Sequence, residues 1–165
     1  MKFARKVICT LLTVVLLNAS MATPVLAAEA SEIPELQATV VSFTTTPNSV
    51  NQQQRSTTFI DTSIDMAFSA EGMHITIFTE MTMTGSLVGV KDISIKKKGI
   101  LGIWTTVATS SGAELTNASG IVVALNYAGA EKGETYKVIC THYGNVDGYR
   151  ELYHESEEIT CWYAE

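Results

Sequence analysis

Residues 133–143 have the sequence GETYKVICTHY, which predicts a turn followed by a β-strand. Tyr136, Val138 and Cys140 fall at every second position and therefore share one face of that strand. A tyrosine that opens a late strand just after a glycine-containing turn is typical of a tyrosine corner, in which the hydroxyl bonds to the backbone. The stretch thus favours a Greek-key β-sandwich and gives Tyr136 a structural role.

The same two-residue alternation recurs along the chain after residue 57. In residues 60–68, for example, apolar side chains alternate with Asp61, Ser63 and Asp65. Strands are predicted at 60–68, 75–83, 93–96, 103–109 and 121–127, from 136 onward, and at 158–163, with loops at 85–89 and 110–119. About seven strands and no long amphipathic helical pattern predict an all-β, antiparallel sandwich of immunoglobulin-like or fibronectin type. A small barrel of strands is the alternative.

The N-terminus has the pattern of a secretory signal peptide. Three positive charges lie within residues 2–6, an apolar run covers residues 7–17, and small residues end the region near Ala27. The apolar run is shorter than the roughly 20 residues that span a bilayer. We therefore expect a signal peptide at 1–27, cleaved after Ala27, Ala28 or Ala30, and a secreted or cell-envelope protein with no stable membrane insertion.

The remaining chain divides into a leader and one domain. Residues 28–56 have mixed composition and a polar run without periodicity, so we expect a flexible leader, although residues 36–43 could form a short strand. Residues 57–165 then form the sandwich. Loss of the signal peptide removes three of the 11 basic residues and none of the 17 acidic ones. The net charge of the remaining chain is therefore 8 − 17 = −9. This charge disfavours nucleic acid and anionic lipid as partners.

Two cysteines remain after the signal peptide, which contains Cys9. If the last two predicted strands form a hairpin centred near Arg150, Cys140 and Cys161 lie ten and eleven residues from its tip and face each other. An even pair of cysteines in an oxidising compartment favours a bond. We therefore predict a Cys140–Cys161 disulfide, with two separate buried thiols as the alternative.

The candidate binding site is a basic run followed by an apolar turn. Three lysines end one predicted strand, and the turn before the next strand contains aliphatic residues. The candidate binding residues are Lys96, Lys97, Lys98, Ile100, Leu101 and Trp104. Either the apolar residues are exposed at the tip of a hairpin and contact a partner, or they fold back over the edge of the sandwich while the lysines protect that edge. The second arrangement is the commoner one.

Other patterns give little support for a catalytic or metal site. Asp147-Gly148 in the segment 145–151 is a better turn signal than a calcium signal, because the full EF-hand spacing is absent. Cys140 and His142 share a strand face, but a disulfide would remove the nucleophile. Aromatic residues between 143 and 163 could stack on sugars, yet aromatic residues on strands are more often core residues. We expect no catalytic residues, no metal and no cofactor.

From about Ile60 onward the chain resembles a group of small, uncharacterised secreted proteins of Gram-positive bacteria. The shared pattern is a strand ending in Lys-Lys, a short turn, Trp-Thr-Thr-Val and later Gly-x-x-Tyr-x-Val. Here these motifs are residues 95–98, 104–107 and 133–138. The resemblance implies an exported immunoglobulin-like sandwich and supplies no activity. Where the group's turn is usually polar, this chain has Ile100, Leu101 and Ile103.

These observations favour a non-catalytic binding module that acts at the cell envelope or outside the cell, on a cell-wall polymer or an extracellular protein. This expectation rests on analogy at the level of the fold. A small secreted effector or toxin is the alternative function, and an enzyme whose site is assembled from distant residues is a third.

Overall fold

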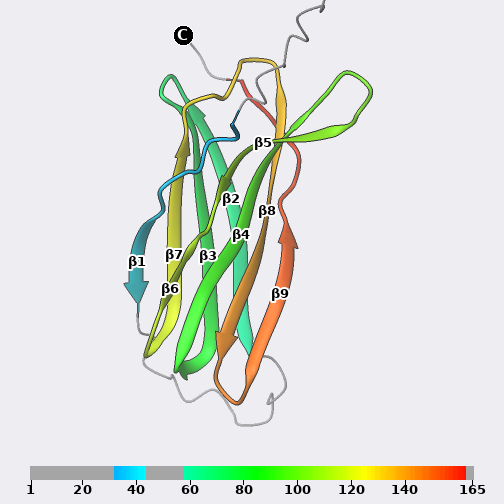
Figure 1. The fold of residues 1–165 in the computed structure, drawn as a ribbon. Helices are drawn as coiled ribbons and strands as arrows, with labels where there is room; N and C mark the ends of the chain where they lie inside the picture. Colours follow the sequence, from blue (N-terminus) through cyan, green and yellow to red (C-terminus); the bar gives the residue numbers. More distant parts are fainter. Residues whose placement is uncertain (1–31, 44–57, 163–165) are drawn as a thin grey trace, which may run out of the picture. The chain divides into compact units, whose positions relative to one another are not determined.

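The computed structural model describes residues 32–43 and 58–162, which form ten β-strands and no helix (Figure 1). The predicted signal peptide, residues 28–31 and 44–57, and the last three residues lie outside this part. In the described part there is also no helix long and apolar enough to cross a membrane. The strands are β1 (Thr39–Phe43), β2 (Phe59–Ser69), β3 (Gly72–Gly85), β4 (Leu87–Lys98), β5 (Trp104–Ser110), β6 (Ala113–Leu115), β7 (Ala118–Tyr127), β8 (Thr135–Asn145), β9 (Tyr149–Glu155) and β10 (Ile159–Thr160).

The strands form two antiparallel sheets. One has the order β1-β7-β3-β2, and the other is built around the β4–β8 pair. The outer edge of β4 pairs with β5 and β6, and the outer edge of β8 pairs with β9 and β10. The neighbours β2-β3-β7 and β4-β8-β9 correspond to strands A-B-E and C-F-G of immunoglobulin-like domains. The predicted all-β sandwich is therefore confirmed, with ten strands in place of about seven.

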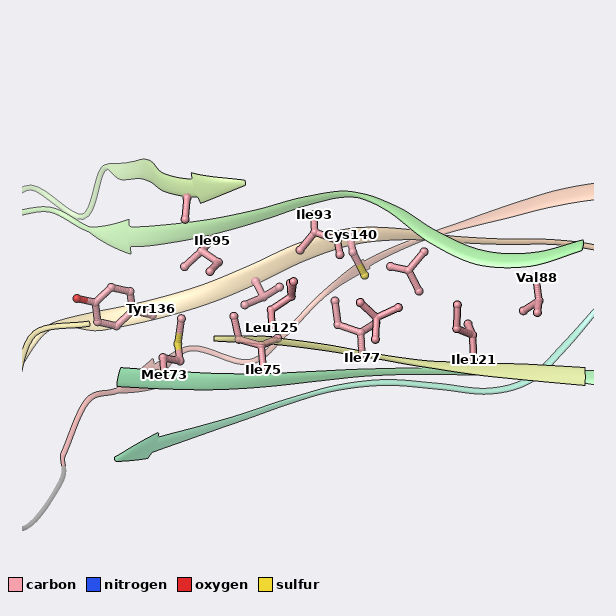
Figure 2. Packing of buried hydrophobic residues seen from close by; sticks show 14 of the residues in the cluster. Met73, Ile75, Ile77, Val88, Ile93, Ile95, Ile121, Leu125, Tyr136 and Cys140 are labelled. Atoms are coloured by element: carbon pink, nitrogen blue, oxygen red, sulfur yellow. The ribbon is translucent and has the colours of Figure 1, made fainter. Parts of the chain in front are cut away.

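Alternating apolar side chains from the two sheets meet in a common core (Figure 2). β3 and β7 supply one side of the core and β4 and β8 supply the other. Residues with at most 1% exposure include Met73, Ile75, Ile77, Met81, Val88, Val90, Ile93, Ile95, Ile121, Val123, Tyr136 and Val138. Each such side chain contributes about 1.5–3 kcal/mol on burial, which makes this core the main source of stability.

β4 keeps its apolar side chains in the core by means of a β-bulge. Its register with β8 shifts between Lys91 and Ser94, and Asp92 has a positive φ of 53°. The extra residue changes the alternation, so that Val90 and Ile93 both point inward although they are three positions apart. Residues 85–89, which the sequence predicts as a loop, instead contain the last residue of β3, Gly85, and the start of β4 at Leu87.

The start of β8 is fixed by the predicted tyrosine interaction. The hydroxyl of Tyr136 accepts a hydrogen bond of 2.9 Å from the backbone N–H of Glu131, five residues upstream. The ring is fully buried and packs against Phe68 and Tyr127 at centroid distances of 6.1 and 6.3 Å. This is the hydroxyl-to-backbone bond of a tyrosine corner, and it connects the β7–β8 loop to the core.

The predicted flexible leader is wrong for residues 32–43, which belong to the sandwich. β1 pairs with β7 over five residues, from Thr39↔Ala124 to Phe43↔Gly120. Just before β1, the N–H of Leu36 donates to the carbonyl of Thr109 in β5. The segment therefore borders both sheets, and β1 lies where strand D lies in an immunoglobulin constant domain. The domain begins near residue 32 and not at residue 57.

Candidate functional site

The β4–β5 hairpin projects beyond the rest of the two sheets (Figure 1). Residues 99–103, which we call the hairpin tip, join the two strands. The N–H of Gly99 donates to the carbonyl of Ile103, and the N–H of Gly102 donates to the carbonyl of Gly99. Gly102 has a positive φ of 74°, a backbone conformation that residues other than glycine rarely adopt. The turn is thus closed by its own backbone bonds, without help from the core.

The aliphatic side chains of the hairpin tip are among the most exposed in the described structure. Ile100 is 105% exposed, Leu101 85% and Ile103 65%. Single exposed apolar residues are ordinary on protein surfaces, but a contiguous group on a projecting element is typical of an interaction site. The tip is therefore the strongest candidate contact surface in the described part of the chain.

The base of the hairpin is held by charged and aromatic contacts. Lys97 pairs with Glu131 at 2.9 Å, and Lys98 pairs with Glu158 at 2.6 Å. The hydrogen bond from Lys97 to Glu131 raises the pKa of the Lys97 ammonium group. Trp104 is half-buried, and the Lys137 ammonium lies 4.4 Å from its ring centroid. These contacts join the hairpin to β8 and to the loops that precede β8 and β10.

The structure thus divides the six predicted binding residues into two groups. Ile100 and Leu101 are exposed, so the expected fold-back is wrong for them. Trp104 folds against Lys98 and Lys137, as the fold-back arrangement predicts. Lys96, on the outer face of the sheet, pairs in register with Lys137 and Thr106. The candidate contact surface is therefore the aliphatic tip, and at least Lys97 and Lys98 of the three lysines stabilise its base.

The segment 145–151 is the turn of the β8–β9 hairpin. The side-chain oxygen of Asn145 accepts a hydrogen bond from the N–H of Gly148, which has a positive φ of 125°. This confirms the turn interpretation of Asp147-Gly148. In the described part of the chain, no group of three or more His, Cys, Asp or Glu residues is placed to hold a metal ion.

The predicted disulfide is wrong, because Cys140 and Cys161 are both buried and free. The β8–β9 turn places His154, and not Cys161, opposite Cys140. Cys161 follows β10, and its N–H donates to the carbonyl of Glu134, which lies six residues before Cys140 in the chain. Six residues of a strand span about 20 Å, whereas disulfides join Cα atoms less than about 7 Å apart. The sequence prediction missed β9, and this omission caused the wrong pairing.

We expect both thiols to be unreactive in the folded protein and fully reactive without a reductant after unfolding. Burial raises the pKa of the Cys140 thiol to about 12, which keeps it protonated. Alkylation with iodoacetamide, followed by peptide mass spectrometry, would measure this. Peptides containing Cys140 and Cys161 should be unmodified at pH 8 and alkylated in urea. A disulfide-linked peptide, or a melting temperature that falls with dithiothreitol, would contradict the free thiols.

The inner face of β8 also holds a polar cluster that the sequence reveals only in part. His142 is fully buried; its Nδ1 lies 2.6 Å from Thr79 Oγ1 of β3, and its Nε2 lies 3.1 Å from His154 Nδ1 of β9. Cys140 Sγ lies 3.6 Å from the same Nε2. A buried, protonated thiol lacks both the charge and the solvent access that a nucleophile needs. The arrangement therefore favours a structural role for the cluster.

The chain matches no protein-family model, and the searches of curated proteins and of solved structures found no match.

Proposed function

We propose that this protein is an exported, non-catalytic binding module that acts at the cell envelope or outside the cell through the tip of its β4–β5 hairpin. The observation that carries the proposal is the exposure of Ile100, Leu101 and Ile103 on a projecting element. The signal-peptide pattern of residues 1–27 and the resemblance to secreted proteins of Gram-positive bacteria support export.

The hairpin suits binding because its tip is presented on a constrained support. The strand pairing of β4 with β5 and the ion pairs of Lys97 and Lys98 restrict the base before any partner binds. A constrained element loses less conformational entropy on association, so more of the apolar contact energy appears as affinity. Burial of the aliphatic side chains then supplies the driving force.

The partner that this tip fits best is an extracellular or wall-associated protein with an apolar pocket. Polysaccharides are usually recognised by aromatic faces and convergent polar groups, and residues 99–103 contain neither. An apolar pocket on a protein, by contrast, can remove these aliphatic side chains from water, and that burial is favourable in proportion to the apolar area covered. A cell-wall polymer remains the other partner class that the experiment below distinguishes.

We expect the purified protein to pellet with isolated cell walls and the variant Ile100→Asp/Leu101→Asp to bind at least about tenfold more weakly. Two buried charges without partners are costly in an apolar contact, and 1.4 kcal/mol already corresponds to a tenfold change. Co-sedimentation across a range of wall concentrations gives the apparent Kd. Protease treatment of the walls should abolish binding if a wall protein is the partner, and leave it intact if a polymer is.

The matched control is Ile60→Asp/Met83→Asp, which adds the same charge at exposed apolar positions of β2 and β3. It should bind as the original protein does. Both variants should keep their unfolding free energy to within about 0.5 kcal/mol, because surface substitutions rarely do more. Failure of the original protein to pellet would contradict envelope binding, and equal loss in both variants would exclude the tip as the contact.

A further inference from the structure

A second feature of the fold, unrelated to the hairpin tip, is the pair of histidines between β8 and β9. The imidazole of His142 is fully buried and hydrogen-bonds through both nitrogens, to Thr79 at 2.6 Å and to His154 at 3.1 Å. The two imidazole centroids lie 5.2 Å apart. A single side chain thus connects β3 of one sheet, β8 of the other and the edge strand β9.

We infer that His142 and His154 form an acid-sensitive latch, which holds β9 against β8 while both imidazoles are neutral and releases it when both are protonated.

The hydrogen-bond inventory explains this dependence. A neutral imidazole has one N–H donor and one acceptor nitrogen, so His142 Nε2 and His154 Nδ1 need one proton between them. When both rings are protonated, both nitrogens are donors, and they would face each other at 3.1 Å with like charges. The hydroxyl of Thr79 can donate or accept and does not restrict the choice. The doubly protonated pair is therefore incompatible with the closed geometry.

The carboxylates of β9 do not neutralise the positive charge of the protonated histidine pair. Glu151 and Glu155 pair in register with Tyr143 and Ile139 and so occupy the outer face of the sheet. Their hydrogen bonds go to Lys91 and Lys137 on that same face. Tyr153, on this outer face too, hydrogen-bonds to Glu155.

The strands packed against the pair from the other sheet also place their acids outward. Asp61 of β2 pairs in register with Glu80 of β3, and Asp65 pairs with Thr76, whereas Thr79 points into the core. Within the described residues no carboxylate hydrogen-bonds to either imidazole. Cys140 is the remaining titratable neighbour, and its buried thiol stays protonated and neutral.

The proton balance gives the direction of the effect. Burial, together with the positive charge that His154 can carry, lowers the pKa of His142 from 6.5 to about 4. Between these two values the closed state binds fewer protons than an open or unfolded state does. The contribution of the latch is therefore complete above about pH 6.5 and is lost progressively as the pH falls toward 4.

β9 is the strand that separates from its sheet at the lowest cost in free energy. Among the described residues this edge strand pairs with β8 alone, and six of its seven residues are exposed while His154 is half-buried. β10 pairs separately with the start of β8, so the chain after β9 stays attached when β9 leaves. Local opening is easiest where few apolar contacts are lost.

Hydrogen exchange of the full chain at pH 7.5 and pH 5.0, corrected for intrinsic exchange rates, tests the latch. We expect protection of the β9 amides to fall at least about tenfold at pH 5.0, with little change in the core strands β3 and β7. In His154→Gln, which can still donate to His142 but cannot be charged, the pH response of β9 should be smaller than in the original protein, and the part that remains should come from the burial of His142. His74→Gln, at an exposed histidine of β3, should keep the original response.

Equal β9 protection at both pH values in the original protein would overturn the inference. So would a pH response that is as large in His154→Gln as in the original protein, because groups outside the histidine pair, such as the carboxylates Glu151 and Glu155, would then be its cause. Glu155→Gln tests whether a carboxylate causes the response, because it removes an exposed ion pair with Lys137 and leaves the histidines unchanged.

Discussion

Replacement of Tyr136 by alanine is expected to lower the free energy of unfolding by about 3–5 kcal/mol, the usual cost of removing a large buried ring. The ring has no solvent exposure and packs against Phe68 and Tyr127, so its loss leaves a cavity between the sheets. Whole domains are stable by only about 5–15 kcal/mol. Urea unfolding of the full chain, followed by tryptophan fluorescence, would measure the change.

Tyr136→Phe separates the hydrogen bond from the packing. It keeps the ring but leaves the N–H of Glu131 without this acceptor, at an expected cost of about 1–3 kcal/mol. Tyr127→Phe is the matched control, because no hydrogen bond of the Tyr127 hydroxyl is present among the described residues. It should change stability by less than about 0.5 kcal/mol. Equal, small effects of the two phenylalanine variants would mean that the corner bond contributes nothing to the fold.

The tyrosine corner and the sandwich were predictable because both depend on local signals. Side chains that alternate along one strand must lie on opposite faces, so the buried face of β8 follows from Tyr136, Val138 and Cys140 alone. A tyrosine just after a glycine turn similarly identifies the end of the strand at which the corner forms.

β9 was not predictable in this way because it is an edge strand with little buried surface. Tyr149–Glu155 is charged or aromatic at nearly every position, and six of its seven residues are exposed. Nothing in its sequence requires one face to be apolar. The pairing of Cys140 with His154, and therefore the histidine pair, depends on the register that the turn at Gly148 sets.

The aliphatic composition of the hairpin tip could be predicted from the sequence, but the exposure of its side chains could not. The sequence shows aliphatic residues in a turn after three lysines, and two arrangements satisfy that pattern. Which one forms depends on how far β4 and β5 extend past the sheets, and on the glutamates of distant loops that pair with Lys97 and Lys98. These partners are 34 and 60 residues away in the chain, beyond the range of a local pattern.

The docking of β1 on β7 also depends on residues that are far apart in the chain. The variant Gly120→Ala tests it, and we expect this variant to lower the unfolding free energy by about 1–3 kcal/mol. Gly120 of β7 pairs with Phe43, whose ring lies over it and stacks on Phe78 with centroids 5.2 Å apart. A Cβ at residue 120 would lie 2.0 Å from that ring. The ring would have to leave Phe78, and the end of β1 would separate from β7.

A double-mutant cycle with Phe43→Ala distinguishes this contact from a general intolerance of alanine in β7. Once the Phe43 ring is removed, the added methyl group meets no side chain of β1, so Gly120→Ala should cost little in the Phe43→Ala background. The coupling energy should then be close to the full cost of Gly120→Ala alone, where independent sites would add to within about 0.5 kcal/mol. Additive effects would mean that the Phe43 ring does not lie over Gly120 in solution, and would contradict the docking of this end of β1 on β7.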